Sequence, residues 1–249
     1  MIATPILSVV VPCYNEEGNL VPLITAIRET MQPLQLTYEI IIADDCSTDK
    51  SWEILQALGA QDPRIRALRF ARNVGQSAAL WAGIQAARGQ FIATLDADLQ
   101  NDPKDLPKFL EALKQYDCVC GSRLDNRRQG DNLIRQLSSR IANGVRNKIT
   151  HETISDSACC YRVFKRECAG NLKFFKGMHR FLPTLFKLEG YTVAEIPVSH
   201  HLRFTGKSNY GVWNRLFASS YDLFAVRWMQ KRMFRYQVKD RLNFPPETN

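Results

Sequence analysis

The stretch FIATLDADLQ at residues 91–100 decides how the rest of the chain is interpreted. It opens with an apolar run typical of a buried strand, which is expected to reach Asp98, and it carries Asp96, Asp98 and Gln100 at alternate positions. Alternate residues of a strand share one face, so these three side chains are expected to point the same way where the strand opens into a loop. Their oxygen atoms suit Mg²⁺ or Mn²⁺, and such a cation would clamp a diphosphate.

The residues that follow predict the start of a helix. Asp102 suits the N-cap, Pro103 the first helical position and Asp105 the first turn. From these residues alone, two interpretations stay open. Asp96 and Asp98 either help to hold a metal ion, or they only end a strand before the next helix begins.

The pattern of apolar strand, acidic loop and helix recurs through the first half of the chain. Further strands are predicted at 6–11, 38–43, 65–70 and 117–121, and helices at 20–27, 52–58 and 75–87. Asp44 and Asp45 follow one strand as Asp96 and Asp98 end another. This alternation predicts a doubly wound α/β fold with a mostly parallel central sheet, helices on both faces, and a ligand site beyond the carboxyl ends of the strands.

Two common nucleotide-binding signatures are missing. No Gly-x-Gly-x-x-Gly follows the first strand, and no complete Gly-x-x-x-x-Gly-Lys-Ser/Thr loop occurs. A dinucleotide oxidoreductase and a P-loop NTPase are therefore disfavoured.

Charge is distributed unevenly along the 249 residues. The formal net charge is +8, but residues 1–120 sum to −5 and residues 121–249 to +13. An acidic half joined to a strongly basic half suggests metal chemistry in one, and contact with an anion or a membrane surface in the other. A solvated basic face would explain part of the excess. No nucleic-acid module is recognised, so nucleic acid is not an expected partner.

Seven cysteines occur, mostly in apolar contexts, without the spacing of a zinc site. We expect them to be reduced and buried, which implies the cytosolic side of a membrane. The N-terminus lacks the pattern of a signal peptide. No uncharged apolar run approaches the roughly 20 residues that span a bilayer, so no integral anchor is expected.

Residues 213–236 predict a basic amphipathic helix. Apolar and aromatic residues recur near helical spacing, with Arg227, Lys231, Arg232 and Arg235 at and beyond the end of the series. Such a helix either lies in the lipid headgroup layer or packs against the sheet. A helix that uses one face for each purpose satisfies both interpretations.

Five segments in order resemble family-2 glycosyltransferases of the GT-A fold: VVVPCYNEEGNL, IIADDCSTDKSWEIL, RNVGQSAALWAGIQAARG, FIATLDADLQNDPKDL and GSR. Residues 155–166 and 195–211 are similar to the branch that glycosylates a polyprenyl phosphate, of which dolichol-phosphate mannosyltransferase is the type. The resemblance implies a GT-A, Rossmann-like domain at 1–211. Residues 212–249 are then expected to form a membrane-surface helix and a polar tail.

The resemblance also assigns the donor side. The residues it implies for the donor nucleotide are Pro12, Tyr14, Glu16, Asp45, Asp96, Ala97 and Lys207. Asp45 would accept a hydrogen bond from the base, while Asp44 would only shape the turn. Asp98 and Gln100 would hold Mg²⁺ or Mn²⁺ on the diphosphate, where the cation stabilises the charge of the departing group.

On the acceptor side, the residues implied for the lipid phosphate are Arg123, Arg135, Ser139 and Arg203. The planar guanidinium of arginine can grip a phosphate through two hydrogen bonds. Asp156 stands where relatives that act on hydroxyls carry a Glu-Asp pair, and it is either a positioning residue or a weak base. The implied catalytic residues are therefore Asp96, Asp98, Arg123, Arg135 and Asp156.

These assignments imply a metal-dependent, inverting transferase that moves a hexose to a dolichyl or undecaprenyl phosphate, with mannose from GDP-mannose as the first choice. The alternative in the same class uses a UDP-sugar carrying glucose or N-acetylglucosamine, with a polyprenyl phosphate or a hydroxyl as acceptor. A non-catalytic protein that binds anions or nucleic acid is the alternative from another class. The protein is expected to be peripheral on the cytoplasmic face of a membrane, alone or with a separate anchoring subunit.

Overall fold

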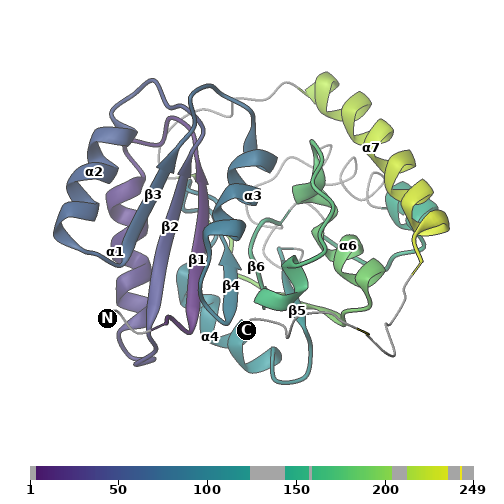
Figure 1. The fold of residues 1–249 in the computed structure, drawn as a ribbon, viewed down its shortest axis with the longest axis horizontal. Coiled ribbons are helices and arrows are strands. Elements are labelled where there is room, and N and C mark those ends of the chain that lie inside the picture. Colours follow the sequence, from purple (N-terminus) through teal and green to yellow (C-terminus); the bar gives the residue numbers. More distant parts are fainter. Residues whose placement is uncertain (1–3, 124–143, 157–158, 204–211, 235–241, 243–249) are drawn as a thin grey trace.

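The computed structural model describes residues 4–123, 144–156, 159–203, 212–234 and 242, and for 212–220 it describes the backbone alone. Within these residues, a seven-stranded sheet forms the centre of the fold (Figure 1). Its strands are β1 (Leu7–Cys13), β2 (Tyr38–Asp44), β3 (Ile65–Arg69), β4 (Phe91–Thr94), β5 (Cys118–Ser122), β6 (Arg162–Lys165) and β7 (Val193–Pro197).

The strand order is β3-β2-β1-β4-β6-β5-β7. Strand β6 runs antiparallel to both of its neighbours, β4 and β5, and the other paired strands of the described sheet are parallel. The predicted mostly parallel sheet is therefore confirmed. The antiparallel strand β6 was not predicted.

Helices cover both faces of the sheet, as predicted. Helices α1 (Leu20–Met31), α2 (Ser51–Gln61) and α4 (Leu106–Ala112) pack on one face, and α3 (Gln76–Ala86), α6 (Leu182–Glu189) and α7 (Val212–Arg232) on the other. Val9 and Val11 of β1 belong to the first core and Val10 to the second, as the alternation of a strand requires. Shorter helical pieces are η1 (Pro103–Asp105), η3 (Arg166–Ala169), η4 (Met178–Arg180) and residues 144–150.

Strand β4 ends at Thr94, four residues earlier than predicted. The Leu95 amide still donates to the Val10 carbonyl oxygen at 3.1 Å, but the chain then turns, and Leu99 has a left-handed φ of +59°. The prediction that Asp96, Asp98 and Gln100 share the face of a strand was therefore wrong, because a turn positions them. The predicted N-cap is confirmed: the Asp102 side chain accepts from the Lys104 amide at 2.9 Å, at the start of η1.

The cysteines agree with the prediction of reduced thiols. All seven are free; Cys46 and Cys160 are half-buried, and the other five are buried. Burial raises the pKa of the Cys13 thiol to about 12, and the carboxylates of Asp44 and Glu16 add to the shift.

In the part of helix α7 whose side chains are described, from Tyr221 on, one side packs on the core. Val226 is fully buried and Leu223 nearly so, whereas Tyr221, Phe224 and Trp228 are 80%, 66% and 63% exposed. Asp222 ties the helix to η4, because Arg180 Nη2 donates to its carboxylate at 2.8 Å. In the described part of the chain, no helix has the length and apolar character needed to cross a bilayer.

Candidate active site

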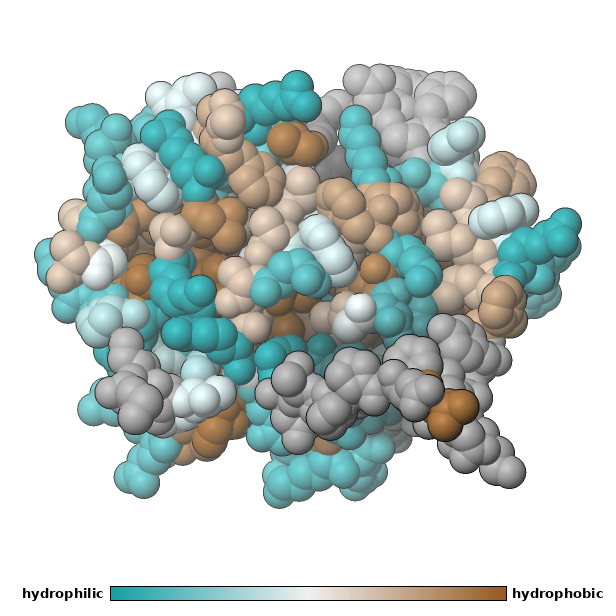
Figure 2. Space-filling view, viewed as in Figure 1, coloured by the Kyte–Doolittle hydropathy of each residue, from teal (hydrophilic) through white to brown (hydrophobic). Residues whose placement is uncertain are grey.

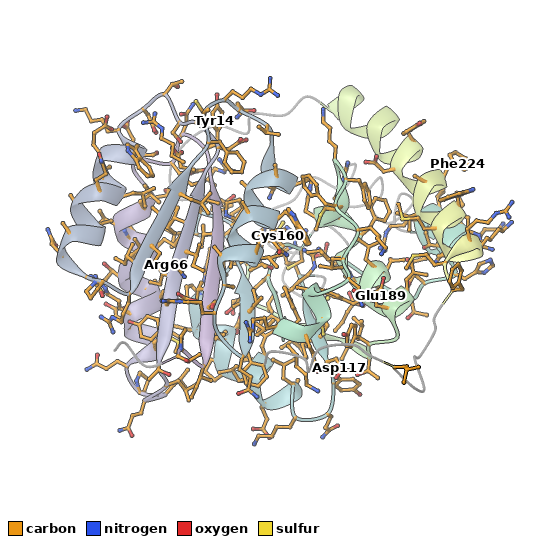
Figure 3. All side chains as sticks on the ribbon, in the orientation of Figure 1. Tyr14, Arg66, Asp117, Cys160, Glu189 and Phe224 are labelled. Carbon is orange, nitrogen blue, oxygen red and sulfur yellow. The ribbon has the colours of Figure 1, made fainter. Side chains whose placement is uncertain are left out.

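The acidic loops meet at one edge of the sheet, where β1, β2 and β4 end. Hydrogen bonds join the loop after β1 to the loop after β2: Asn15 N donates to Ser47 Oγ at 2.9 Å, and Glu16 N to Ser51 Oγ at 3.0 Å. Asn15 and Cys46 both adopt positive φ angles, +56° and +63°, which turns the two loops sharply. Pro12 and Tyr14 are half-buried at this edge, and Figure 3 shows Tyr14 just beyond the end of β1.

Asp45 holds the start of α3. Its carboxylate accepts hydrogen bonds from the Val74 and Gly75 amides, both at 2.7 Å, and Gly75 has a φ of +103°. A carboxylate has about four acceptor sites, so these bonds leave room for a further donor such as a base. The binding of the base by Asp45 stays a prediction.

Asp44 binds within its own turn. Its carboxylate accepts from the Ser47 amide at 3.1 Å and from the Ser47 hydroxyl, and Arg69 Nε lies 3.2 Å from its second oxygen. These are the contacts of a residue that shapes the turn.

A cluster of three carboxylates lies beyond β1 and β4. Glu16, Asp96 and Asp98 are near enough to influence one another: burial raises the pKa of the Glu16 carboxyl, and Asp98 and Asp96 add to the shift against the opposing effect of Asn19 and Arg203. Burial also raises the pKa of Asp96, with Asp98 as the next cause. We define these three residues as the carboxylate cluster.

Arg203 contacts two members of this cluster, while Arg123 and Arg162 act on the third, Asp96. Arg203 Nη2 donates to Asp98 Oδ2 at 2.9 Å, and Arg203 Nη1 lies 3.7 Å from Glu16 Oε1. The other oxygen of Asp98 accepts from the Gln100 amide at 3.2 Å. The contact from Gln100 to Asp98 thus runs through the backbone amide, and the metal-binding function of the Gln100 side chain stays a prediction.

The cluster fits a divalent cation that a diphosphate helps to hold. Among the described residues, no group of three or more His, Cys, Asp or Glu side chains is arranged so that it could hold a metal ion. Mg²⁺, however, is commonly bound through one or two carboxylates together with the phosphates of a substrate. Asp98 is 5% exposed and already faces a cationic group, so its surroundings suit a bound cation.

Arg123 and Asp156 form a second charged group. Arg123 Nε and Nη2 donate to the two oxygens of Asp156 at 2.7 and 2.9 Å, and the Arg123 amide adds a third bond at 3.2 Å. Burial lowers the pKa of Arg123, but the hydrogen bonds and charge of Asp156 outweigh it, so the net shift is upward. Asp156 thus accepts three hydrogen bonds from Arg123, which are the contacts expected of a residue that positions an arginine.

Glu195 of β7 fixes the backbone segment that carries Asp156. Its carboxylate accepts from the Ser155 amide at 2.9 Å, the Ser155 hydroxyl at 3.0 Å and the Asp156 amide at 3.2 Å. Ser122 at the end of β5 contacts Ser155 through its hydroxyl at 3.2 Å. We define Arg123, Asp156, Ser155 and Glu195 as the arginine-holding network.

Several predicted site residues fall outside the described residues. These are Arg135, Ser139 and Lys207. The structure therefore brings together Glu16, Asp96, Asp98 and Arg203, and it pairs Arg123 with Asp156 where the charge of Arg123 still acts on Asp96.

Sequence reasoning missed three residues near these groups. Gln76, at the start of α3, donates from Nε2 to Asp96 Oδ1 at 3.0 Å and lies 3.7 Å from the Cys160 sulfur (Figure 3 labels Cys160). Glu195 was missed although it is a carboxylate inside an apolar run, which was the available signal. Nothing in the sequence around Gln76 or Cys160 marked either one as a neighbour of Asp96.

The histidines have local partners. His179 Nδ1 lies 2.7 Å from the Ser77 hydroxyl, and His201 Nε2 lies 3.2 Å from Asp102 Oδ2. Both sets of contacts agree with structural functions rather than with metal binding.

Comparison with known sequences decides the family. The family described as "Glycosyl transferase family 2" matches residues 8–172, which is more than half of the chain. The chain belongs to glycosyltransferase family 2. The predicted family is thereby confirmed.

Curated relatives of this family-2 glycosyltransferase act on polyprenyl phosphates, by their names. The chain is 35% identical over 230 residues to the dodecaprenyl-phosphate galacturonate synthase of Rhizobium johnstonii, covering 90% of this chain and 67% of that protein. It is 36% identical over 219 residues to the undecaprenyl-phosphate 4-deoxy-4-formamido-L-arabinose transferase of Edwardsiella ictaluri, covering 87% and 66%. The chain thus spans about two thirds of the length of these relatives. They confirm the polyprenyl-phosphate branch as the one it resembles.

Solved structures confirm the GT-A fold. Glucosyl-3-phosphoglycerate synthase from Mycobacterium tuberculosis, crystallised with Mn²⁺, UDP and phosphoglyceric acid, matches with a TM-score of 0.66 at 20% identity over 94% of this chain and 81% of that chain. A mannosyltransferase from Pyrobaculum calidifontis, with GDP-Man and Mn²⁺, gives 0.63 at 20% identity over 89% and 63%.

Proposed function

We propose that this glycosyltransferase moves a sugar from a UDP-sugar to a polyprenyl phosphate, with Mg²⁺ or Mn²⁺ as cofactor. The observation that carries the proposal is the carboxylate cluster at the ends of β1 and β4, in which the buried Asp98 contacts the guanidinium of Arg203. The names of the two relatives support the lipid phosphate and a sugar other than mannose. UDP therefore replaces GDP, the first choice from the sequence, as the expected nucleotide.

In the proposed mechanism, Asp98 and Gln100 would hold the cation, which would supply positive charge to stabilise the leaving diphosphate. Pro12, Tyr14, Glu16, Asp45 and Ala97 line the nucleotide side, and Asp96 faces the sugar. Gln76 fixes one oxygen of Asp96, so its carboxylate stays oriented while the sugar is transferred.

The acceptor phosphate supplies its own nucleophile. A phosphate oxygen is anionic at neutral pH, so the reaction needs no strong general base, and a direct displacement inverts the anomeric carbon. Arg123 would bind this phosphate with the N–H groups that Asp156 leaves unoccupied, together with Arg135 and Ser139. Arg203 would contact the donor diphosphate or the acceptor phosphate, and Lys207 would contact the donor. Asp156 then acts as the residue that positions Arg123.

The exposed side of α7 is proposed to lie on the membrane. Tyr221, Phe224 and Trp228 are spaced three and four residues apart, so they form one stripe along the helix. Figure 2 shows tan and pale residues beside teal ones where α7 forms the edge of the molecule, and Figure 3 places Phe224 on its outer side. Aromatic rings with Arg227, Lys231 and Arg232 nearby match an interfacial helix. The protein would then sit on the cytoplasmic face, with a separate anchoring subunit as a further partner.

The donor is tested by a panel of labelled UDP-galacturonate, UDP-glucose, UDP-N-acetylglucosamine and GDP-mannose, each with undecaprenyl phosphate and Mn²⁺. We expect one UDP-sugar to give a lipid-linked product and GDP-mannose to give none. Product from GDP-mannose alone would overturn the choice of UDP. Product on a hydroxyl acceptor, but not on the lipid phosphate, would overturn the acceptor.

The membrane contact is tested by flotation with vesicles that contain an anionic lipid. Changing Tyr221, Phe224 and Trp228 together to Ser should lower the bound fraction about tenfold or more, because three large rings would no longer be buried. The matched control changes Tyr116, an exposed aromatic residue between α4 and β5, to Ser. Equal binding of the triple variant and wild type would contradict the proposal.

A further inference from the structure

Arg203 occupies an unusual position for a residue assigned to an acceptor phosphate. Its side chain spans two loops, because one guanidinium nitrogen lies 2.9 Å from Asp98 after β4 and the other 3.7 Å from Glu16 after β1. The side chains of Asp98 and Glu16 are 7% and 14% exposed, and that of Arg203 is 30% exposed. Arg203 therefore closes the carboxylate cluster from the solvent side.

The backbone beside Arg203 is fixed independently of that ion pair. His201 N donates to the Gln100 carbonyl oxygen at 2.9 Å, and Asn101 and His200 form an isolated β-bridge. The segment before Arg203 is thus joined to the same turn that carries Asp98. Arg203 can move its long side chain away from Asp98 while its main chain stays in reach of the site.

We propose that Arg203 is an internal counter-ion that competes with the divalent cation for Asp98. It neutralises Asp98 when no metal is bound, and it leaves that carboxylate when the metal and the nucleotide diphosphate arrive together. The proposal rests on the metal-dependent transfer proposed above and adds a coupling between its two ligands. The diphosphate offers the guanidinium a new anionic partner, so binding of the nucleotide promotes binding of the metal.

Charge explains why the exchange needs both ligands. Arg203 is the arginine in contact with Asp98 and Glu16, whereas Arg123 and Arg162 act on Asp96, and a buried carboxylate is costly unless a cation pairs with it. A metal ion alone would meet the guanidinium at the same oxygen of Asp98, and two cations at that distance repel each other. A diphosphate relieves this repulsion by binding both. Such coupling is reciprocal, so the metal must promote nucleotide binding by the same factor.

The experiment measures binding of Mn²⁺ alone, by the electron paramagnetic resonance of the free ion, with and without UDP. Compared with wild type, Arg203→Gln should bind Mn²⁺ about tenfold more tightly without UDP, and UDP should improve that affinity by about tenfold less, as expected of a coupling in the usual range. Arg203→Lys keeps a positive charge but lacks the planar guanidinium, so its affinity for Mn²⁺ should lie between those of wild type and Arg203→Gln. Unchanged or weaker Mn²⁺ binding by Arg203→Gln would overturn the proposal.

Arg28→Gln is a matched control. Arg28 and Asp62 form an arginine–aspartate pair of 2.7 Å with side chains 35% and 9% exposed, close to the values for Arg203 and Asp98, but on α1 and after α2. This variant should bind Mn²⁺ as wild type does. Equal tightening in both variants would also overturn the proposal, because loss of any positive charge would then suffice. Sugar transfer by the wild type is a separate measurement, so failure of the proposed function can be told from failure of this inference.

Discussion

Two of the arginine–aspartate pairs near the site, Arg203–Asp98 and Arg123–Asp156, differ in how firmly they are held. Arg203 meets Asp98 through one hydrogen bond of 2.9 Å, and its side chain is 30% exposed. Arg123 meets Asp156 through two side-chain bonds of 2.7 and 2.9 Å, with side chains 15% and 0% exposed. Glu195 then fixes the Asp156 backbone from β7, whereas the contacts described beside Arg203 join the backbone of His200 and His201 to the turn of Asp98.

This difference separates two tasks that one residue type can perform. A single half-exposed contact can be exchanged for another cation at small cost, whereas a buried, two-bonded pair costs several kcal/mol to break. The carboxylate cluster is thus suited to a ligand that comes and goes. The arginine-holding network is suited to presenting one guanidinium in a fixed direction.

The largest expected effect comes from Asp98→Asn. Because the amide cannot hold the cation as a carboxylate does, sugar transfer should fall by about 10³-fold, the scale on which lost electrostatic stabilisation of a leaving group is felt. The free energy of unfolding should change by no more than about 1 kcal/mol, since the partner Arg203 stays partly in water. Initial rates with Mn²⁺ and urea unfolding measure the two quantities.

Asp62→Asn provides the comparison for this variant, since Asp62 also pairs with arginine but lies outside the site. It should leave turnover unchanged. If Asp98→Asn transferred sugar at the wild-type rate, the carboxylate cluster would have no part in the chemistry.

Asp156→Asn should lower the stability of the fold much more than Asp98→Asn does. Arg123 would keep its charge in a nearly buried position without a counter-ion, so the free energy of unfolding should fall by about 3 kcal/mol. Turnover should fall through a raised KM for the lipid phosphate, because Arg123 is no longer oriented, while the KM for the donor stays the same. Urea unfolding and steady-state kinetics test this. A variant as stable as wild type would show that the network is not what fixes Arg123.

Sequence patterns predicted the edge of the sheet where the acidic loops meet, because that edge depends on local order. Apolar runs such as 38–43 form strands, acidic residues follow them, and parallel strands bring their carboxyl ends to one edge. The pattern failed where β4 ends, because the turn at Leu99 with its positive φ is a backbone property that alternating residues do not reveal. The meeting of Glu16, Asp96 and Asp98 at this edge was therefore predicted for a partly wrong reason.

The pairings of the arginines could not be predicted in the same way. Arg123 and Asp156 are 33 residues apart, and Arg203 and Asp98 are 105 apart. Their contacts depend on β6, which runs antiparallel between β4 and β5 and so changes which loops are neighbours. The residue types indicated the kind of chemistry, but the partner of each arginine depends on strand β6, which was not predicted.

The smallest expected effect concerns a third ion pair, which lies outside the site and serves as a reference for the stability of the other two. Lys165 Nζ lies 2.6 Å from Asp117 Oδ1, with side chains 35% and 23% exposed. The hydrogen bond from Lys165 is the main cause that lowers the pKa of Asp117 from 3.8 to about 2, and Thr192 contributes. Because the folded state lowers this pKa, the pair stabilises the protein above about pH 4, and that contribution is lost as the pH falls from 3.8 through about 2.

Asp117→Asn should therefore lower the free energy of unfolding by about 1 kcal/mol at pH 7, after allowance for solvent screening, and by almost nothing at pH 2. Urea unfolding of wild type and variant between pH 2 and pH 7 measures the difference. A loss that stays constant with pH would mean that Thr192 and shape, rather than charge, stabilise this turn. Asp156→Asn could instead lower the free energy of unfolding at pH 7 by the same amount as Asp117→Asn. Burial and the second hydrogen bond would then not explain why the Arg123 pair is firm, and the contrast between an exchangeable and a fixed arginine would fail.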